Sequence, residues 1–197
     1  MPRAAGQIDP RKSEAILVAA STLFAERGGA VSMEEIARQA GVSKQTLYNR
    51  FASKSDLARA LAQRRSEAIT APLRTEGDPQ AVLTALAASL ISKVCTPEKG
   101  ESLRGVALMS PSIPGIAQAI YDGGPGESLR RITAWMAEQD RKGLLSIPDP
   151  AHAAEMFTGM AIGHGHLRAL LGIGHPEHEI EARARETARR FIRAFAP

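Results

Sequence analysis

The segment from Val31 to Leu57 constrains the fold of this chain more than any other part of the sequence. Ser32, Ser43 and Ser53 stand where a helix needs a side-chain oxygen to accept hydrogen bonds from its unpaired first-turn amides. Gly41 lies two residues before Ser43 and permits the positive φ that ends a helix. The segment therefore predicts two short helices joined by a glycine turn, with a further helix starting directly after Ser53.

The two short helices need a third helix to pack against. Each is too short to be stable alone, although their apolar residues fall on one face. Between Ser13 and Arg27 apolar residues recur at helical spacing, until Gly28 and Gly29 stop the pattern. We therefore expect a three-helix head that contains a helix-turn-helix, an arrangement typical of DNA-binding domains.

The outward face of the second short helix carries side chains that can read DNA. Each residue turns the side chain by about 100° around the helix axis, so Leu47 points inward while Gln45 and Asn49 point outward. Side-chain amides can bond an adenine edge, and Lys or Arg a guanine edge. The residues that flank the two amides are Lys44, Thr46, Tyr48 and Arg50. An ordinary solvated helix face is the alternative, but the hydroxyl of Tyr48 can bond a phosphate oxygen, which favours DNA.

Over the residues A-G-V-S-K-Q-T-L-Y-N-R-F-A-S-K-S-D-L the chain resembles the helix-turn-helix of the TetR family of bacterial transcriptional regulators. The resemblance extends from about Ser13 to Ala62 and implies a DNA-binding mode. It implies phosphate contacts by Ser32, Thr46, Tyr48 and Lys54, and base contacts by Lys44, Gln45, Asn49 and Arg50. Many members carry His or Tyr where this chain has Asn49 and Arg50, so the operator sequence is not implied.

The distribution of charge agrees with a DNA-binding head. Residues 1–65 hold 11 Lys and Arg against 6 Asp and Glu, a net charge of +5, whereas residues 66–197 hold 14 against 15, a net charge of −1. Lys and Arg replace the counterions of a phosphate backbone. Arg3, Arg11 and Lys12 could form an arm that follows the minor groove, and a loose terminus is the alternative.

The remainder of the chain predicts helices without a sheet. Apolar residues recur at helical spacing after Asp78 and Pro79, and no stretch alternates with a period of two over strand length. The expected helices cover residues 79–95 and about 98–109, 114–121, 126–142, 151–171 and 176–195. We therefore predict an all-α protein, with a helix-turn-helix domain at residues 1–65 and a helical bundle at residues 66–197.

The resemblance also implies that the bundle binds a ligand and pairs with its twin. The stretch A-I-G-H-G-H-L-R-A-L-L-G further resembles the AefR-like subgroup. Candidate pairing residues are the apolar side chains of Leu129, Ile132, Trp135 and Met136 and the small residues Gly159, Gly163 and Gly165. Close packing inside one subunit is the alternative, because small-residue spacing of this kind is established for membrane helices.

Large, adaptable apolar side chains recur on the middle helices and could line a ligand pocket. They are Met109, Trp135, Met156, Phe157 and Met160. They suggest a small or medium-sized, largely apolar effector. The alternative is that these residues are plain core, because a helix that is apolar on one face is normally just buried.

Several kinds of site are not expected. The single cysteine, Cys95, excludes an internal disulfide and fits a reducing cytoplasm, and no apolar run approaches the roughly 20 residues that span a membrane. His164 and His166 would point about 200° apart on a helix, so they cannot share a metal ion there. His175 and His178 could share one, yet no further signal supports a metal or cofactor. We expect a soluble, cytoplasmic protein without a membrane partner.

Two functions remain. The first is a homodimeric, ligand-responsive transcriptional regulator, a repressor that binds a palindromic double-stranded DNA operator and is released by a small-molecule effector. The second is an enzyme that acts on a ligand in the helical bundle while the head only localises it to DNA. The sequence favours the first, because neither Cys95 nor any histidine stands in a recognisable nucleophile motif.

Overall fold

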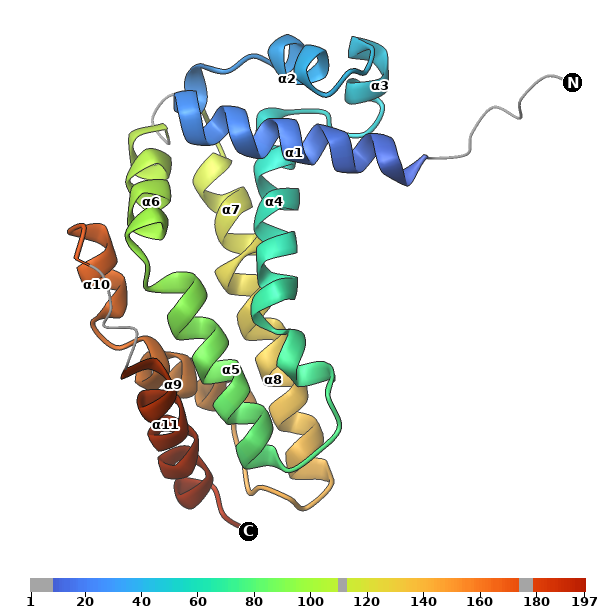
Figure 1. Ribbon diagram of the computed structural model, residues 1–197. Coiled ribbons are helices and arrows are strands. Elements are labelled where there is room, and N and C mark those ends of the chain that lie inside the picture. The colour runs from blue at the N-terminus through green and yellow to red at the C-terminus, as the bar shows by residue number, and fades with distance from the viewer. Residues whose placement is uncertain (1–8, 110–112, 174–178) are drawn as a thin grey trace, which may run out of the picture.

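The computed structural model describes residues 9–109, 113–173 and 179–197, which form helices joined by short loops and contain no strand (Figure 1). The all-α expectation is confirmed. In chain order the elements are α1 (Pro10–Arg27), the 3-10 turn η1 (Gly28–Ala30), α2 (Met33–Gln39), α3 (Lys44–Tyr48), α4 (Lys54–Ile69), the 3-10 turn η2 (Ala71–Arg74), α5 (Pro79–Val94), α6 (Pro97–Met109), α7 (Ile116–Gly123), α8 (Pro125–Arg141), α9 (Pro150–Ile162), α10 (Gly165–Leu170) and α11 (Ile180–Ala194).

Helices α1, α2 and α3 form a head at one end of the molecule (Figure 1). Helices α2 and α3 have only seven and five residues, so their stability comes from the apolar core that they share with α1 and the start of α4. The most deeply buried side chains of this core are Ile16, Ala20, Val31, Ile36, Leu47 and Leu57. The expected helix-turn-helix head is therefore present.

Helix α4 connects the head to the rest of the chain. It begins with Ser53 as its cap, whose side chain accepts a hydrogen bond from the Asp56 amide at 3.1 Å, and it packs along α7 and α8. The crossing with α7 is close, because a Cβ on Gly123 would come within 2.5 Å of the Arg59 carbonyl oxygen. Since α4 is continuous across residue 65, the head and the bundle share a helix at the expected domain border.

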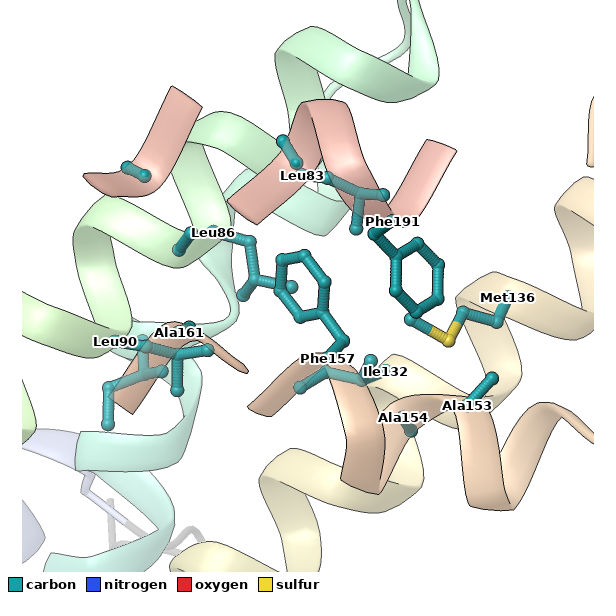
Figure 2. Close-up of a cluster of buried hydrophobic side chains, with 14 of the residues drawn as sticks. Leu83, Leu86, Leu90, Ile132, Met136, Ala153, Ala154, Phe157, Ala161 and Phe191 are labelled. Carbon is teal, nitrogen blue, oxygen red and sulfur yellow. The ribbon is translucent and has the colours of Figure 1, made fainter. Parts of the chain in front are cut away.

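A second core lies between α5, α8, α9 and α11 (Figure 2). Its centre is the pair Phe157 and Phe191, whose rings meet edge to face with centroids 5.2 Å apart. Both side chains are almost completely buried, and Leu83, Leu86 and Met136 lie around them. This core holds α11 against α5 and α9, so the end of the chain closes the bundle.

The prediction of one helix over residues 151–171 is wrong, because these residues form two helices, α9 and α10. Gly163 ends α9 with a φ of +49°, a conformation that side-chain-bearing residues rarely adopt. The guanidinium of Arg183, on α11, covers this end and donates a hydrogen bond to the Ala161 carbonyl at 2.9 Å. A Cβ on Gly163 would collide with that guanidinium. Helix α10 then starts in a new direction and packs on α6.

The other expected helices agree with the structure to within a few residues. The helix expected over residues 176–195 is α11, which starts at Ile180 within the described residues. Residues 176–178 of that expectation lie outside them. No single helix in the described ranges is long and apolar enough to cross a membrane, although α5 and most of α6, bent by 62°, would pass that test together by length and composition.

Candidate nucleic-acid interface

A capping box fixes the start of α2. The Ser32 hydroxyl accepts a hydrogen bond from the Glu35 amide at 3.2 Å, and the Glu35 carboxylate accepts one from the Ser32 amide at 2.8 Å. Arg27 adds an ion pair to the same carboxylate at 2.7 Å. These bonds, from the Ser32 backbone first, then Arg27 and the Ser32 hydroxyl, lower the pKa of Glu35 from 4.5 to about 2. Ser32 is half-buried, and both its hydroxyl and its amide serve to fix the start of α2.

The turn between α2 and α3 depends on Gly41. Its φ of +64° requires glycine, and no neighbouring atom lies within 4 Å of a Cβ placed there, so the reason is backbone conformation and not crowding. Ser43 then caps α3 by accepting a hydrogen bond from the Thr46 amide at 3.1 Å. The hydroxyl groups of Ser43 and Thr46 also bond each other at 2.8 Å. These bonds fix the first turn of α3.

The outward face of α3 is exposed, whereas its inward residue Leu47 is completely buried. The exposed side chains include Gln45, Tyr48 and Asn49. The amide nitrogen of Gln45 donates to the amide oxygen of Asn49 at 2.7 Å, so the two amides form one pair along the helix. This face offers amide donors and acceptors and a phenol hydroxyl to solvent, and such groups bond base edges and phosphates.

Lys44 stands at the start of this face and has a partner from α2. Its ammonium forms an ion pair with Glu34 and lies 5.8 Å from the centre of the Tyr48 ring. The hydrogen bond between the two charged groups raises the pKa of Lys44 and lowers the pKa of Glu34. The sequence did not indicate a role for Glu34. Its partner Lys44 lies on a different helix, so the pair does not show the spacing of three or four residues that is typical of ion pairs within one helix.

Arg50 and Lys54, two of the expected DNA contacts, are turned toward the protein. Both are half-buried. The Arg50 guanidinium donates to the hydroxyl of Ser13 on α1, and the Lys54 ammonium donates to the carbonyl oxygen of Gly29 at 2.8 Å. Arg50 would have to release Ser13 before it could reach a base. No local pattern in the sequence indicates either partner, since both lie more than twenty residues away.

Of the three cations expected in an N-terminal arm, Arg11 and Lys12 are exposed in the first turn of α1. Asp9 caps that helix by accepting a hydrogen bond from the Arg11 amide at 3.0 Å. Arg3 lies outside the described residues.

The residues expected to line a ligand pocket differ in their burial, and the pocket itself stays a prediction. Phe157 is buried in the core, Trp135 packs against that core, and Met156 and Met160 are exposed on α9. The side chain of Met109 lies outside what the structure describes. A shallow hollow of about 620 Å³ lies elsewhere, between the end of α4, η2, α5 and α11, and is lined by Ala68, Ala71, Pro72, Thr75, Ala88, Ser89, Ser92, Lys93 and Ile180.

Helix α9, helix α10 and the residues just after them expose several large apolar side chains. We refer to these residues as the α9–α10 face: Met156, Met160, Leu167, Leu170, Leu171 and Ile173. Their exposed fractions run from 37% to 67%, whereas large apolar side chains are usually buried. By contrast Ile132 and Met136, expected among the pairing residues, are completely buried inside the subunit.

Among the described residues, no group of three or more His, Cys, Asp or Glu side chains is placed to hold a metal ion. His175 and His178 lie outside those residues. The thiol of Cys95 is buried, and burial raises its pKa, which makes the thiol a poorer nucleophile.

Two family models match the chain. The model of the bacterial regulatory proteins of the tetR family matches residues 16–61, and the model of the AefR-like transcriptional repressor C-terminal domain matches residues 81–197. Among solved structures, the flavonoid-responsive regulator FrrA is 30% identical, with a TM-score of 0.70, over 96% of this chain and 99% of FrrA.

Curated relatives match through the head. The HTH-type transcriptional activator FasR of Mycolicibacterium smegmatis is 43% identical over 67 residues, which are 34% of this chain and 30% of FasR. The HTH-type transcriptional repressor KstR2 of Mycobacterium tuberculosis is 43% identical over 58 residues, which are 29% of this chain and 28% of KstR2. The match thus covers less than a third of either relative.

These matches cover the structural features of the head and favour a regulator over an enzyme. The matched residues 16–61 contain the capping box, the Gly41 turn and the exposed face of α3, and both family models describe transcriptional regulators. The hypothesis of a ligand-processing enzyme is therefore wrong, and the protein is a DNA-binding transcription factor. The chain belongs to the TetR family of bacterial transcriptional regulators, and its C-terminal part is of the AefR-like type.

Proposed function

We propose that this protein is a homodimeric repressor that binds a palindromic operator in the bacterial cytoplasm and releases it when a small, largely apolar effector binds. The observation that carries the proposal is the exposed face of α3. Three kinds of polar group are exposed on this face: a pair of side-chain amides, a phenol hydroxyl and the ammonium group of Lys44. A helix with this face, held by a capped turn on a basic head, is suited to a major groove.

The side chains divide into two groups by position. Lys44, Gln45 and Asn49 lie along the outward face of α3, where base edges would be read, and Tyr48 lies beside them for a phosphate. Ser32, Thr46 and Lys54 lie at or near helix starts, where first-turn amides also favour an anion. Arg50 would join the base-reading group only after it leaves Ser13.

The exposed apolar residues of the α9–α10 face support a dimer that pairs through them. Exposed apolar patches of this kind mark interaction surfaces in soluble proteins. A second copy of the chain would cover the same residues on both subunits through a twofold axis. That axis would place two α3 helices against half-sites that lie on one face of the duplex, about one or more helical turns apart.

Similar proteins support the proposed repression and the proposed class of effector. The model that matches residues 81–197 describes a repressor domain, which supports repression, although the head is 43% identical both to the activator FasR, over 67 residues, and to the repressor KstR2, over 58 residues. FrrA is named for its response to flavonoids, small molecules whose aromatic carbon skeleton carries hydroxyl groups. An effector of similar size and polarity is therefore proposed here.

The test is operator binding by a double variant, Tyr48→Phe with Lys54→Ala. An operator is first selected from a random duplex pool with the wild-type protein. The double variant should bind that operator at least about tenfold more weakly at physiological salt, since charged phosphate hydrogen bonds contribute about 1.5–3 kcal/mol. Unchanged binding would remove both side chains from the interface.

A further inference from the structure

The ion pair between Glu34 and Lys44 lies on the face that we propose meets DNA. Glu34 is on the first turn of α2, Lys44 is the first residue of α3, and their side chains are 52% and 62% exposed. The carboxylate draws the ammonium across the turn and keeps it near the Tyr48 ring. A negative charge therefore stands among groups that would approach a polyanion.

We propose that Glu34 is an intramolecular competitor of the DNA backbone: it holds Lys44 in an ion pair that a phosphate must displace, and so it lowers the affinity of the head for DNA of any sequence. This inference rests on the proposed contact between Lys44 and DNA, in which Lys44 meets a base edge on the operator and a backbone phosphate on DNA of other sequences. Glu34 touches Lys44 in the free protein and acts through it, so it is a positioning residue for DNA binding and not itself a contact.

The physical reason is that Lys44 exchanges one anion for another. A free lysine that reaches a phosphate releases a condensed counterion and adds to the salt dependence of binding. When Lys44 leaves Glu34 for a phosphate, the gain in binding free energy is smaller. The ion pair with Glu34 is lost, and an unpaired carboxylate remains beside the phosphates. Lys44 therefore contributes less affinity, and a smaller salt slope, than its charge and exposure would give alone.

The neighbouring acid, Glu35, does not fill this role. Its carboxylate accepts hydrogen bonds from the Ser32 amide and hydroxyl and forms an ion pair with Arg27. Glu35 is therefore part of the capping box at the start of α2. The partner side chain of Glu34, by contrast, lies on α3 itself. Removal of the Glu34 carboxylate should leave the capping box intact.

Weaker binding to random DNA would help the protein to find its operator. A regulator meets on the order of 10⁶–10⁹ competing non-specific sites in a genome. Non-specific binding consists almost entirely of phosphate contacts. A carboxylate that restrains one phosphate-seeking lysine leaves more of the protein free to find its operator.

The experiment measures binding of the full chain to a random-sequence 30-bp duplex between 50 and 200 mM salt. The variants are Glu34→Gln, Lys44→Gln and the double variant. Glu34→Gln should bind about twofold to fivefold more tightly, the range that exposed ion pairs cover, with a salt slope that is steeper by up to about 0.9. Lys44→Gln should bind more weakly than wild type. In the Lys44→Gln background, Glu34→Gln should leave the slope unchanged.

Two further variants separate pairing from other effects. Glu186→Gln makes the same change in net charge on α11, where Glu186 pairs with Arg189 and Arg190 away from the head, and it should not change the slope. Glu34→Asp keeps a negative charge near the start of α2, which favours the helix, but shortens the side chain by one methylene. It should steepen the slope by less than Glu34→Gln does, with unchanged thermal unfolding.

Three outcomes would overturn the inference. If Glu34→Gln leaves affinity and slope unchanged while Lys44→Gln weakens binding, Lys44 contacts DNA and Glu34 does not compete. If Glu34→Gln strengthens binding equally with and without Lys44, the effect is one of net charge. If Lys44→Gln binds like wild type, Lys44 does not contact DNA, and the proposed contact fails together with the inference.

Discussion

Introducing charge on the α9–α10 face should separate the two subunits of the proposed dimer. Met156 and Met160 lie one turn apart on α9, and their exposed fractions are 44% and 37%. Fully burying a methionine side chain contributes about 1.5–3 kcal/mol, so burying the exposed part of each contributes roughly 1 kcal/mol. A twofold interface uses each residue twice. Removing four such contributions should therefore cost about 4 kcal/mol.

The double variant Met156→Glu with Met160→Glu should then weaken dimerisation by at least about a hundredfold, because each 1.4 kcal/mol changes Kd tenfold. Sedimentation equilibrium over a range of concentrations measures the effect. Ala151→Glu is the control, since Ala151 is also exposed on α9 but lies outside the α9–α10 face. A double variant that stays dimeric at wild-type concentrations, or a control that dissociates equally, would refute this choice of interface.

Three further variants test other parts of the structure. Phe157→Ala should lower the free energy of unfolding by about 3–5 kcal/mol in urea titrations, because its ring fills the core against Phe191; a small loss would instead favour a pocket-lining role. Because the pKa of Glu35 is lowered to about 2, its contribution to stability is complete above its unfolded value near 4.5 and is lost as the pH falls toward 2. The stability gap between wild type and Glu35→Gln should therefore narrow over that range, and a gap independent of pH would contradict the assignment. Asn49→Ala should weaken binding to a selected operator by about 1–3 kcal/mol and leave binding to random duplex unchanged, as fluorescence anisotropy on both duplexes would reveal; equal losses on both would remove Asn49 from base reading.

Sequence patterns predicted the head well because its signals are local. A capping serine and its partner lie three residues apart, and the turn at Gly41 depends on the conformation of one residue. The division of α3 into a buried Leu47 and an exposed amide face follows from helical geometry alone. The break between α9 and α10 was not predictable in this way. Glycine is tolerated within helices, and it is the positive φ of Gly163, which the sequence does not reveal, that ends α9.

The partners of individual side chains were less predictable, because they come from distant parts of the chain. Arg50 and Lys54 bond Ser13 and Gly29, and neither bond leaves a pattern in the sequence. Phe157 and Met156 are neighbours in sequence and both large and apolar, yet one lies in the core and the other on the surface. Apolar character alone could not separate core, interface and pocket.

We propose that the chain reads DNA as a twofold dimer through α3. Selection of binding sites from a random duplex pool with the purified protein tests it most directly. We expect an enriched palindrome whose half-sites are separated by about one or more helical turns, and a relaxed preference at one base pair of each half-site when Asn49→Ala is used. A pool without an enriched sequence, or one that holds a single asymmetric site, would contradict it.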